Sequence, residues 1–248
     1  MKSLLTLSFF VLVSAGAYSQ VTDITTTAVK HYPLIIQDSP SKLFTMRQFN
    51  QNYLSGYRLM VRGLNATIKN PRYVDLMQIG MQTFFLMPLT HEEGHRSILT
   101  ALGIGSVSQP FFNSQGAAYV NGVTDIVLQN LRDNNLPTYI RLHTAGLESD
   151  YMLTLREETM ASFEQDNFSN VKWEYWVRKM AIMQYYLIGL FKYDADLKEE
   201  SNELDRDIVG LDTYGAVRHL FRPTMDFHRY TKYNELTWAE KRFIEVSI

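Results

Sequence analysis

Residues 84–99 read FFLMPLTHEEGHRSIL, and this stretch largely decides the fold. Apolar residues stand on both sides of its polar centre, which is typical of a helix that packs into a protein core. Pro88 lies within the pattern, so we expect the helix to kink or restart there. The sequence therefore predicts a buried helical region that presents a short, charged motif to the interior.

The motif at the centre of this stretch is HEEGH, with His91 and His95 four residues apart and Glu92 directly after the first histidine. Residues four apart lie one turn from each other on the same helix face, so both imidazoles can point at one metal ion. Glu92 then stands where its carboxylate can take a proton from a metal-bound water. A chain with 6 histidines in 248 residues contains HExxH by chance only about 0.01 times.

A catalytic zinc ion needs a third protein ligand, and Glu148 is our candidate. In a helix, Glu148 shares a face with Ala145 and Met152, and a carboxylate that faces a core needs a charge partner. Ala145 and the following Gly146 would let two helices approach closely. The alternatives for the third ligand are His143, Asp150 and Glu158.

The region from 84 to 160 resembles the zincin metallopeptidases, and within them the gluzincin pattern of HExxH followed by a glutamate on a later helix. The resemblance implies that His91, His95 and Glu148 bind Zn²⁺ and that Glu92 is the general base. The expected activity is therefore hydrolysis of peptide bonds in a peptide or protein substrate.

Two positions depart from the gluzincin pattern. Glu93 puts a charge inside the motif, with Arg96 close behind it, and Met152 stands where an aspartate four residues after the distal glutamate often orients a ligand histidine. The longer zincin motif with a third histidine is absent, because Ala101 occupies that position.

The rest of the chain predicts a mainly α fold with a small β element, a single zincin-like domain over residues 20–248. Helices are expected at 40–62, 72–103, 125–132, 138–163, 172–193, 203–221 and 237–246. Residues 116–123 read as a strand, and in zincins an edge strand of this kind pairs with extended substrate. Tyr119 in this strand is our candidate substrate-binding residue.

The first 19 residues are typical of a secretory signal peptide. A positive Lys2 precedes an apolar run at 4–13, and small residues at Ala17 and Ser19 predict cleavage after Ser19. No cysteine follows, which excludes a lipoprotein anchor, disulfides and thiolate metal sites. We expect a secreted or periplasmic protein.

The charge balance excludes a strongly basic surface. Lys and Arg total 24 against 26 Asp and Glu, which argues against a nucleic-acid partner. The mature chain has no apolar run long enough to span a bilayer. The acidic residues between 199 and 212 are expected on a solvated helix face, and His219 and His228 in packing or surface positions.

Two other interpretations remain open at this level. The chain could be a non-catalytic envelope protein that binds another envelope protein and carries a degenerate or metal-free site. Alternatively, a zinc ion could be purely structural, with a fourth ligand such as His143 closing the site.

Overall fold

The structure is a computed structural model that describes residues 31–35, 45–112, 118–194 and 199–246. Residues Tyr32–Ile248 form one compact unit. The predicted signal peptide lies outside the described residues, and so does the predicted start of the first helix near residue 40.

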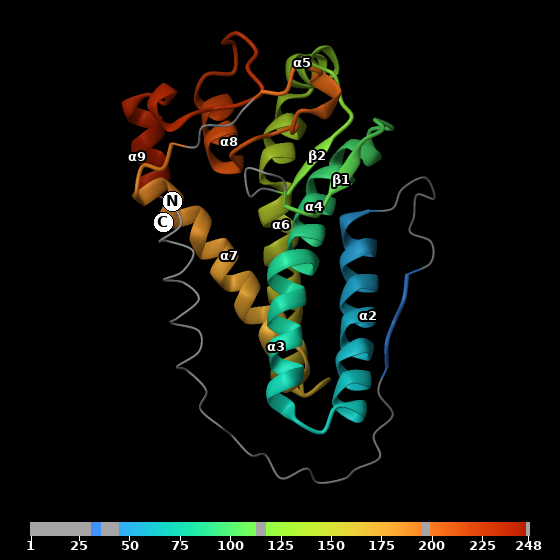
Figure 1. The fold of residues 1–248 in the computed structure, drawn as a ribbon. Helices are drawn as coiled ribbons and strands as arrows, with labels where there is room; N and C mark the ends of the chain where they lie inside the picture. Colours follow the sequence, from blue (N-terminus) through green and yellow to red (C-terminus); the bar gives the residue numbers. More distant parts are fainter. Residues whose placement is uncertain (1–30, 36–44, 113–117, 195–198, 247–248) are drawn as a thin grey trace. The chain divides into compact units, whose positions relative to one another are not determined.

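The described chain is mainly helical with a two-stranded antiparallel sheet, as predicted (Figure 1). In chain order the elements are α2 (Met46–Thr67), α3 (Pro71–Met81), α4 (Met87–Ala101), β1 (Val107–Gln109), β2 (Tyr119–Asn121), α5 (Asp125–Asn134), α6 (Leu136–Ser162), α7 (Lys172–Leu190), α8 (Asp212–Phe221) and α9 (Trp238–Val246).

Helices α3 and α4 are joined without a break by a π-helical turn, Gln82–Leu86. In a regular helix the ring of Pro88 would clash with the carbonyl group of Phe84, and Pro88 has no N–H to donate. The wider π turn carries the chain past this point, and α4 restarts with Pro88 in its first turn. The predicted restart at Pro88 is confirmed.

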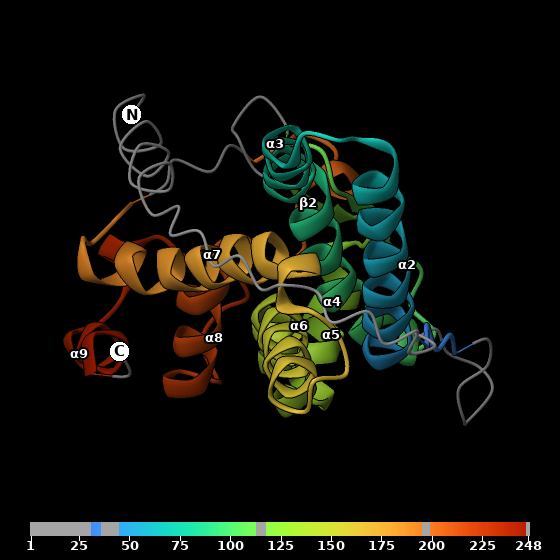
Figure 2. The same cartoon turned by 90° about the horizontal axis from the view of Figure 1, so that it is seen from below.

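Helix α6 contacts α2, α4, α5, α7 and α8, and Figure 2 shows it between α8 and α4. Its approach to α4 is very close. A methyl group at Gly94 on α4 would overlap the carbonyl oxygen of Ala145 on α6 and lie 3.0 Å from Cβ of Ser149. Only glycine permits this approach, and the predicted close contact at Ala145 and Gly146 is confirmed.

An apolar core fills the space between the carboxyl-terminal half of α4, the sheet, α5 and the first half of α6. Its fully buried members include Leu99, Val120, Leu128, Leu142 and Ile208. Burial of side chains of this size stabilises the fold by about 1.5–3 kcal/mol each. The core therefore holds the end of α4 against α6 next to the HExxH motif.

The sheet differs from the edge strand expected over 116–123. Val120 in β2 lies opposite Ser108 in β1, and the carbonyl group of Val120 also accepts a hydrogen bond from Ile208 N–H at 2.9 Å. Gly122 N–H donates to the carbonyl group of Leu204 at 2.9 Å on the same side. Because residues 204–208 already run along β2, this strand does not offer a free edge there.

The single helix predicted at 203–221 is wrong, because α8 begins only at Asp212. The carboxylate of Asp207 accepts hydrogen bonds from the N–H groups of Val209 and Gly210 at 3.4 and 3.0 Å. Gly210 also has a φ of +68°, which a helix does not tolerate. Asp212 therefore lies in the interior, and Asp207 is partly buried, rather than both lying on a solvated helix face.

The most apolar stretch after residue 20, at 180–191, lies mostly in α7. Among the described residues, no helix combines the length and the apolar character needed to cross a bilayer. Helix α7 instead packs against α3, α6 and α9.

Gly94→Ala is expected to destabilise the protein, because the added methyl group forces α4 and α6 apart. We expect a loss of about 2–3 kcal/mol, or roughly 5–10 °C in melting temperature. Gly56→Ala in α2 is the matched control, since a methyl group there meets nothing within 4 Å; it should be neutral or stabilising by up to about 1 kcal/mol. Equal melting temperatures for the two variants would contradict the close packing.

Candidate metal centre

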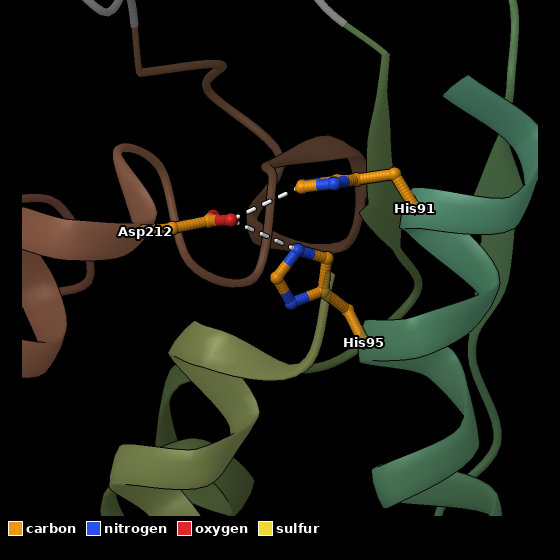
Figure 3. A group of neighbouring side chains, drawn as sticks. All are labelled: His91, His95 and Asp212. Atoms are coloured by element: carbon orange, nitrogen blue, oxygen red, sulfur yellow. Dashed lines mark hydrogen bonds and ion pairs between the residues drawn. The ribbon is translucent and has the colours of Figure 1, made fainter. Parts of the chain in front are cut away.

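Helix α4 carries His91, Glu92 and His95 into the interior. These side chains are 5%, 7% and 1% exposed, respectively. The two imidazole rings lie on one helix face with their centres 5.1 Å apart and point toward the same place (Figure 3). The spacing predicted from the sequence thus brings the two histidines together.

The carboxylate that meets the two histidines belongs to Asp212. Its Oδ2 lies 3.1 Å from His91 Nε2 and 3.4 Å from His95 Nε2, and its side chain is 3% exposed (Figure 3). Ligands that hold a tetrahedral zinc ion at about 2.0–2.1 Å lie roughly 3.3 Å from one another. The three donor atoms therefore fit one metal ion. Among the described residues, no other group of three His, Asp or Glu side chains meets at one point in this way.

Gly146 on α6 leaves the space in which these donor atoms converge. A methyl group at Gly146 would overlap Nε2 of His91 and lie 2.5 Å from Nε2 of His95. Any side chain at this position would displace the imidazoles or fill the place between them.

Both histidines are oriented through their other ring nitrogen. His91 Nδ1–H donates to Oδ2 of Asp150 at 2.8 Å, and His95 Nδ1–H donates to the carbonyl group of Leu142 at 2.7 Å. With the proton on Nδ1, each Nε2 keeps its lone pair for a metal ion. Asp150, an alternative third ligand in the sequence analysis, thus acts on the far side of His91.

Asp150 is held in turn by Arg178 on α7. The Arg178 guanidinium donates to Asp150, to Thr90 Oγ1 at 2.9 Å and to Glu174 Oε1 at 2.7 Å, and it has no exposed surface. Buried charges are tolerated when they are paired in this manner. The chain of contacts from Glu174 to His91 therefore fixes the orientation of the first histidine.

A second carboxylate lies at the outer end of this chain of contacts. Glu157 on α6 is fully buried, and neither of its carboxylate oxygens has a hydrogen-bonding partner among the described residues; the same holds for Oε2 of Glu174. Burial and the charge of Glu174 raise the pKa of Glu157 well above its usual value, although Arg178 opposes this. Glu157 therefore keeps its proton to a higher pH than an exposed glutamate does.

The hydroxyl group of Tyr185 on α7 also lies at the site. It lies 2.9 Å from His91 Nε2, and the two rings stack with their centres 5.4 Å apart. A hydroxyl at this place can donate a hydrogen bond to a negatively charged oxygen that forms next to the histidines.

Burial and neighbouring charges perturb the acidic and basic groups of the site. Burial raises the pKa of Glu92 to about 7 and that of Asp207 to about 6. Burial alone would raise the pKa of Asp212 and lower that of His95. Their mutual attraction instead holds the pKa of Asp212 below its usual range and raises that of His95 to about 9. A metal ion would replace the protons that the group shares.

Glu148, the third ligand expected from the sequence, does not lie with the two histidines. Its carboxylate accepts hydrogen bonds from Arg141 at 2.7 and 2.5 Å, and its side chain is 36% exposed. The face of α6 that meets α4 carries Gly146 and Asp150, each two positions away from Glu148 and on the other side of the helix. Asp212 occupies the place expected for Glu148.

The other predicted residues lie in separate environments. His143 faces His219 rather than the three donor atoms. Glu158 pairs with Lys179 at 2.9 Å. Tyr119 is half-buried in β2 opposite Gln109, and its role in substrate binding stays a prediction.

Asp212, Tyr185 and Arg178 lie at the site but are not expected there from the sequence. Only Asp212 carries a local signal: it follows Gly210, which can end one element, and it opens a helical pattern where the macrodipole favours a carboxylate. Tyr185 and Arg178 are marked by no motif, since they act on α4 only through the packing of α7.

Comparison with known proteins assigns the chain to no family. No family model matches the chain, and no curated protein or solved structure matches it. The chemical argument therefore depends on the site itself.

Asp212→Asn is expected to weaken metal binding, because an amide cannot supply the negative charge. With a fluorescent zinc indicator as competitor, we expect a loss of affinity of at least about 100-fold. Glu148→Gln is the matched control and should bind zinc like the unaltered chain. If only Glu148→Gln lost zinc affinity, Glu148 rather than Asp212 would be the third ligand.

Glu157→Gln is expected to change how stability depends on pH. Above about pH 4.5 the unfolded chain releases the Glu157 proton while the folded chain retains it, because the folded pKa is raised. The stability of the unaltered protein should therefore fall, relative to Glu157→Gln, by up to about 1.4 kcal/mol per pH unit as the pH rises.

Urea unfolding at pH 5, 7 and 9 measures this difference. Glu158→Gln, at the adjacent exposed position, is the control and should show no such trend. Parallel curves for Glu157→Gln and the unaltered chain would contradict the raised pKa of Glu157.

Proposed function

We propose that this chain is a zinc-dependent hydrolase on a zincin-like helical scaffold and that it cleaves peptide bonds. The observation that supports this most directly is the position of Asp212 Oδ2, 3.1 Å from His91 Nε2 and 3.4 Å from His95 Nε2, with all three donor atoms within 4.8 Å of one another. Glu92 follows His91 on the same helix. Two imidazoles and one carboxylate are a donor set that zinc uses in catalytic sites, where a fourth position stays open.

The residues of the site divide the chemistry among them. A bound zinc ion lowers the pKa of a water molecule to about 7 and polarises a carbonyl group. Glu92 accepts the proton of the attacking water and then donates it to the leaving amine. Tyr185 donates a hydrogen bond to the oxygen that becomes negative. Asp150 holds His91 in the tautomer that leaves Nε2 free.

The location of the activity follows from the first residues. The apolar run at 4–13 and the small residues before position 20 favour export of the chain. A histidine and carboxylate site also suits an oxidising compartment, because it contains no thiol that could be oxidised. We therefore place the hydrolase outside the cytoplasm, either secreted or in the periplasm.

A second candidate function is favoured by the burial of the site. The site residues are only 1–7% exposed, and such burial is also typical of residues that hold a structural metal ion; these residues are His91, Glu92, His95 and Asp212. In this case the chain would be an envelope protein that binds a partner. Apolar side chains such as Trp238, Phe163 and Phe191, each more than 65% exposed, would form the contact.

Glu92→Gln separates the two candidates. In the hydrolase, the variant should bind as much zinc as the unaltered chain but hydrolyse labelled casein at least about 100-fold more slowly, since the proton acceptor is lost. Glu93→Gln is the matched control: Glu93 pairs with Arg96 at 2.7 Å and should be dispensable for hydrolysis.

Metal content is measured on the same preparations by elemental mass spectrometry. A zinc-loaded chain that hydrolyses neither casein nor a random peptide mixture would contradict the hydrolase and favour the structural ion. So would equal rates for Glu92→Gln and the unaltered chain.

A further inference from the structure

A second pair of histidines lies between α6 and α8. His143 on α6 and His219 on α8 are both fully buried, and the ring of Tyr139 contacts the two imidazoles edge-on. We name these three residues the second histidine cluster. None of them belongs to the group formed by His91, His95 and Asp212.

All polar atoms of the second histidine cluster lack a partner among the described residues. These atoms are both ring nitrogens of His143, both ring nitrogens of His219 and the hydroxyl oxygen of Tyr139. A neutral imidazole has one N–H donor and one lone pair, and buried polar groups are almost always satisfied. Five unsatisfied atoms in one place therefore indicate that something polar binds among them.

The rings of the second pair are about as close as those of the first, but they are nearly parallel, with 26° between their planes, whereas the planes of the first pair cross at 68°. The ring centres of His143 and His219 are 5.5 Å apart, compared with 5.1 Å for His91 and His95. A metal ion held about 2.0–2.1 Å from one nitrogen of each of two imidazoles sets their ring centres roughly 5–5.5 Å apart. The spacing fits a shared metal ion in both pairs.

The charge and protonation of the surroundings also allow a cation. Burial lowers the pKa of His143 to about 3 and that of His219 to about 4, so both imidazoles are neutral and can act as ligands. The arginines near His219 are themselves paired with carboxylates: Arg132 with Asp133, Arg218 with Glu235 and Arg222 with Glu240.

We propose that His143 and His219 bind a second transition-metal ion, with the Tyr139 hydroxyl within its reach. Nitrogen donors without a thiolate or carboxylate favour Zn²⁺ or Cu²⁺ over Mg²⁺ and Ca²⁺. The ion would join α6 to α8 at the place where Gly215 admits the His143 ring, since a methyl group at Gly215 would overlap that ring. Gly215 lies one turn after Asp212, so this ion would also fix Asp212 in position.

The number of zinc ions per chain tests this proposal by native mass spectrometry of the purified chain with Zn²⁺. We expect two ions on the unaltered chain, one on His219→Gln, one on Asp212→Asn and none on the double variant. His228→Gln, which alters an exposed histidine, is the matched control and should keep two ions.

The outcomes separate this inference from the proposed function. One ion that Asp212→Asn loses and His219→Gln retains would overturn the second site and leave the first intact. One ion that His219→Gln loses and Asp212→Asn retains would support the second site and contradict the first. Two ions that both remain on His219→Gln would also overturn the second site.

A measurement on the unaltered chain avoids the risk that a variant fails to fold. The chain has 6 histidines, and His31 and His228 are exposed. Long-range ¹H–¹⁵N spectra of the imidazole nitrogens should show metal-bound signatures for four of the six on addition of Zn²⁺. Signatures for His91 and His95 alone, with none for His143 and His219, would overturn the proposal.

Discussion

The close contact of α4 with α6 is the constraint on which the rest of the structure depends. Gly94 lets the backbone of α6 approach at Ala145, and Gly146 leaves the space into which His91 and His95 point. A larger residue at either glycine would separate the helices and spread the imidazoles at the same time. The same two glycines therefore set both the stability of the helix pair and the geometry of the metal centre. A substitution that changes one of these properties also changes the other.

Buried charges fix the orientation of this pair of helices rather than adding much stability. Removing Arg178, Glu174 and Asp150 from water costs several kcal/mol per ion by general estimates, and their mutual attraction offsets most of this cost. The network instead fixes how the helices are oriented, because the guanidinium of Arg178 contacts both Asp150 on α6 and Thr90 on α4. Asp150 can therefore reach Nδ1 of His91 in only one arrangement of the three helices.

The parts of the site that the sequence predicts are those set by local spacing. His91, Glu92 and His95 share one helical turn, and the helices around them follow from apolar periodicity and from Pro88. Asp212 is 121 positions after His91, so its place depends on how α8 packs. Glu148 was favoured because it shares a face with apolar residues, but Leu155 on that face is 64% exposed. The buried part of α6 carries a polar face, with Gly146 and Asp150, beside apolar residues such as Leu142 and Leu153, so hydrophobic periodicity alone does not locate the site.

That polar face explains why several unusual groups occur in one small protein. His143, Gly146, Asp150 and Glu157 follow one another along α6 at spacings of three, four and seven residues, and all are buried. A polar stripe inside a protein is stable only when each of its groups has a partner, because the low dielectric constant makes an unpaired group costly. Asp150 meets this demand through His91 and Arg178, and Glu157 lowers the cost by keeping its proton, because burial raises its pKa. His143 faces the same demand at the other end of the stripe, where no partner lies among the described residues.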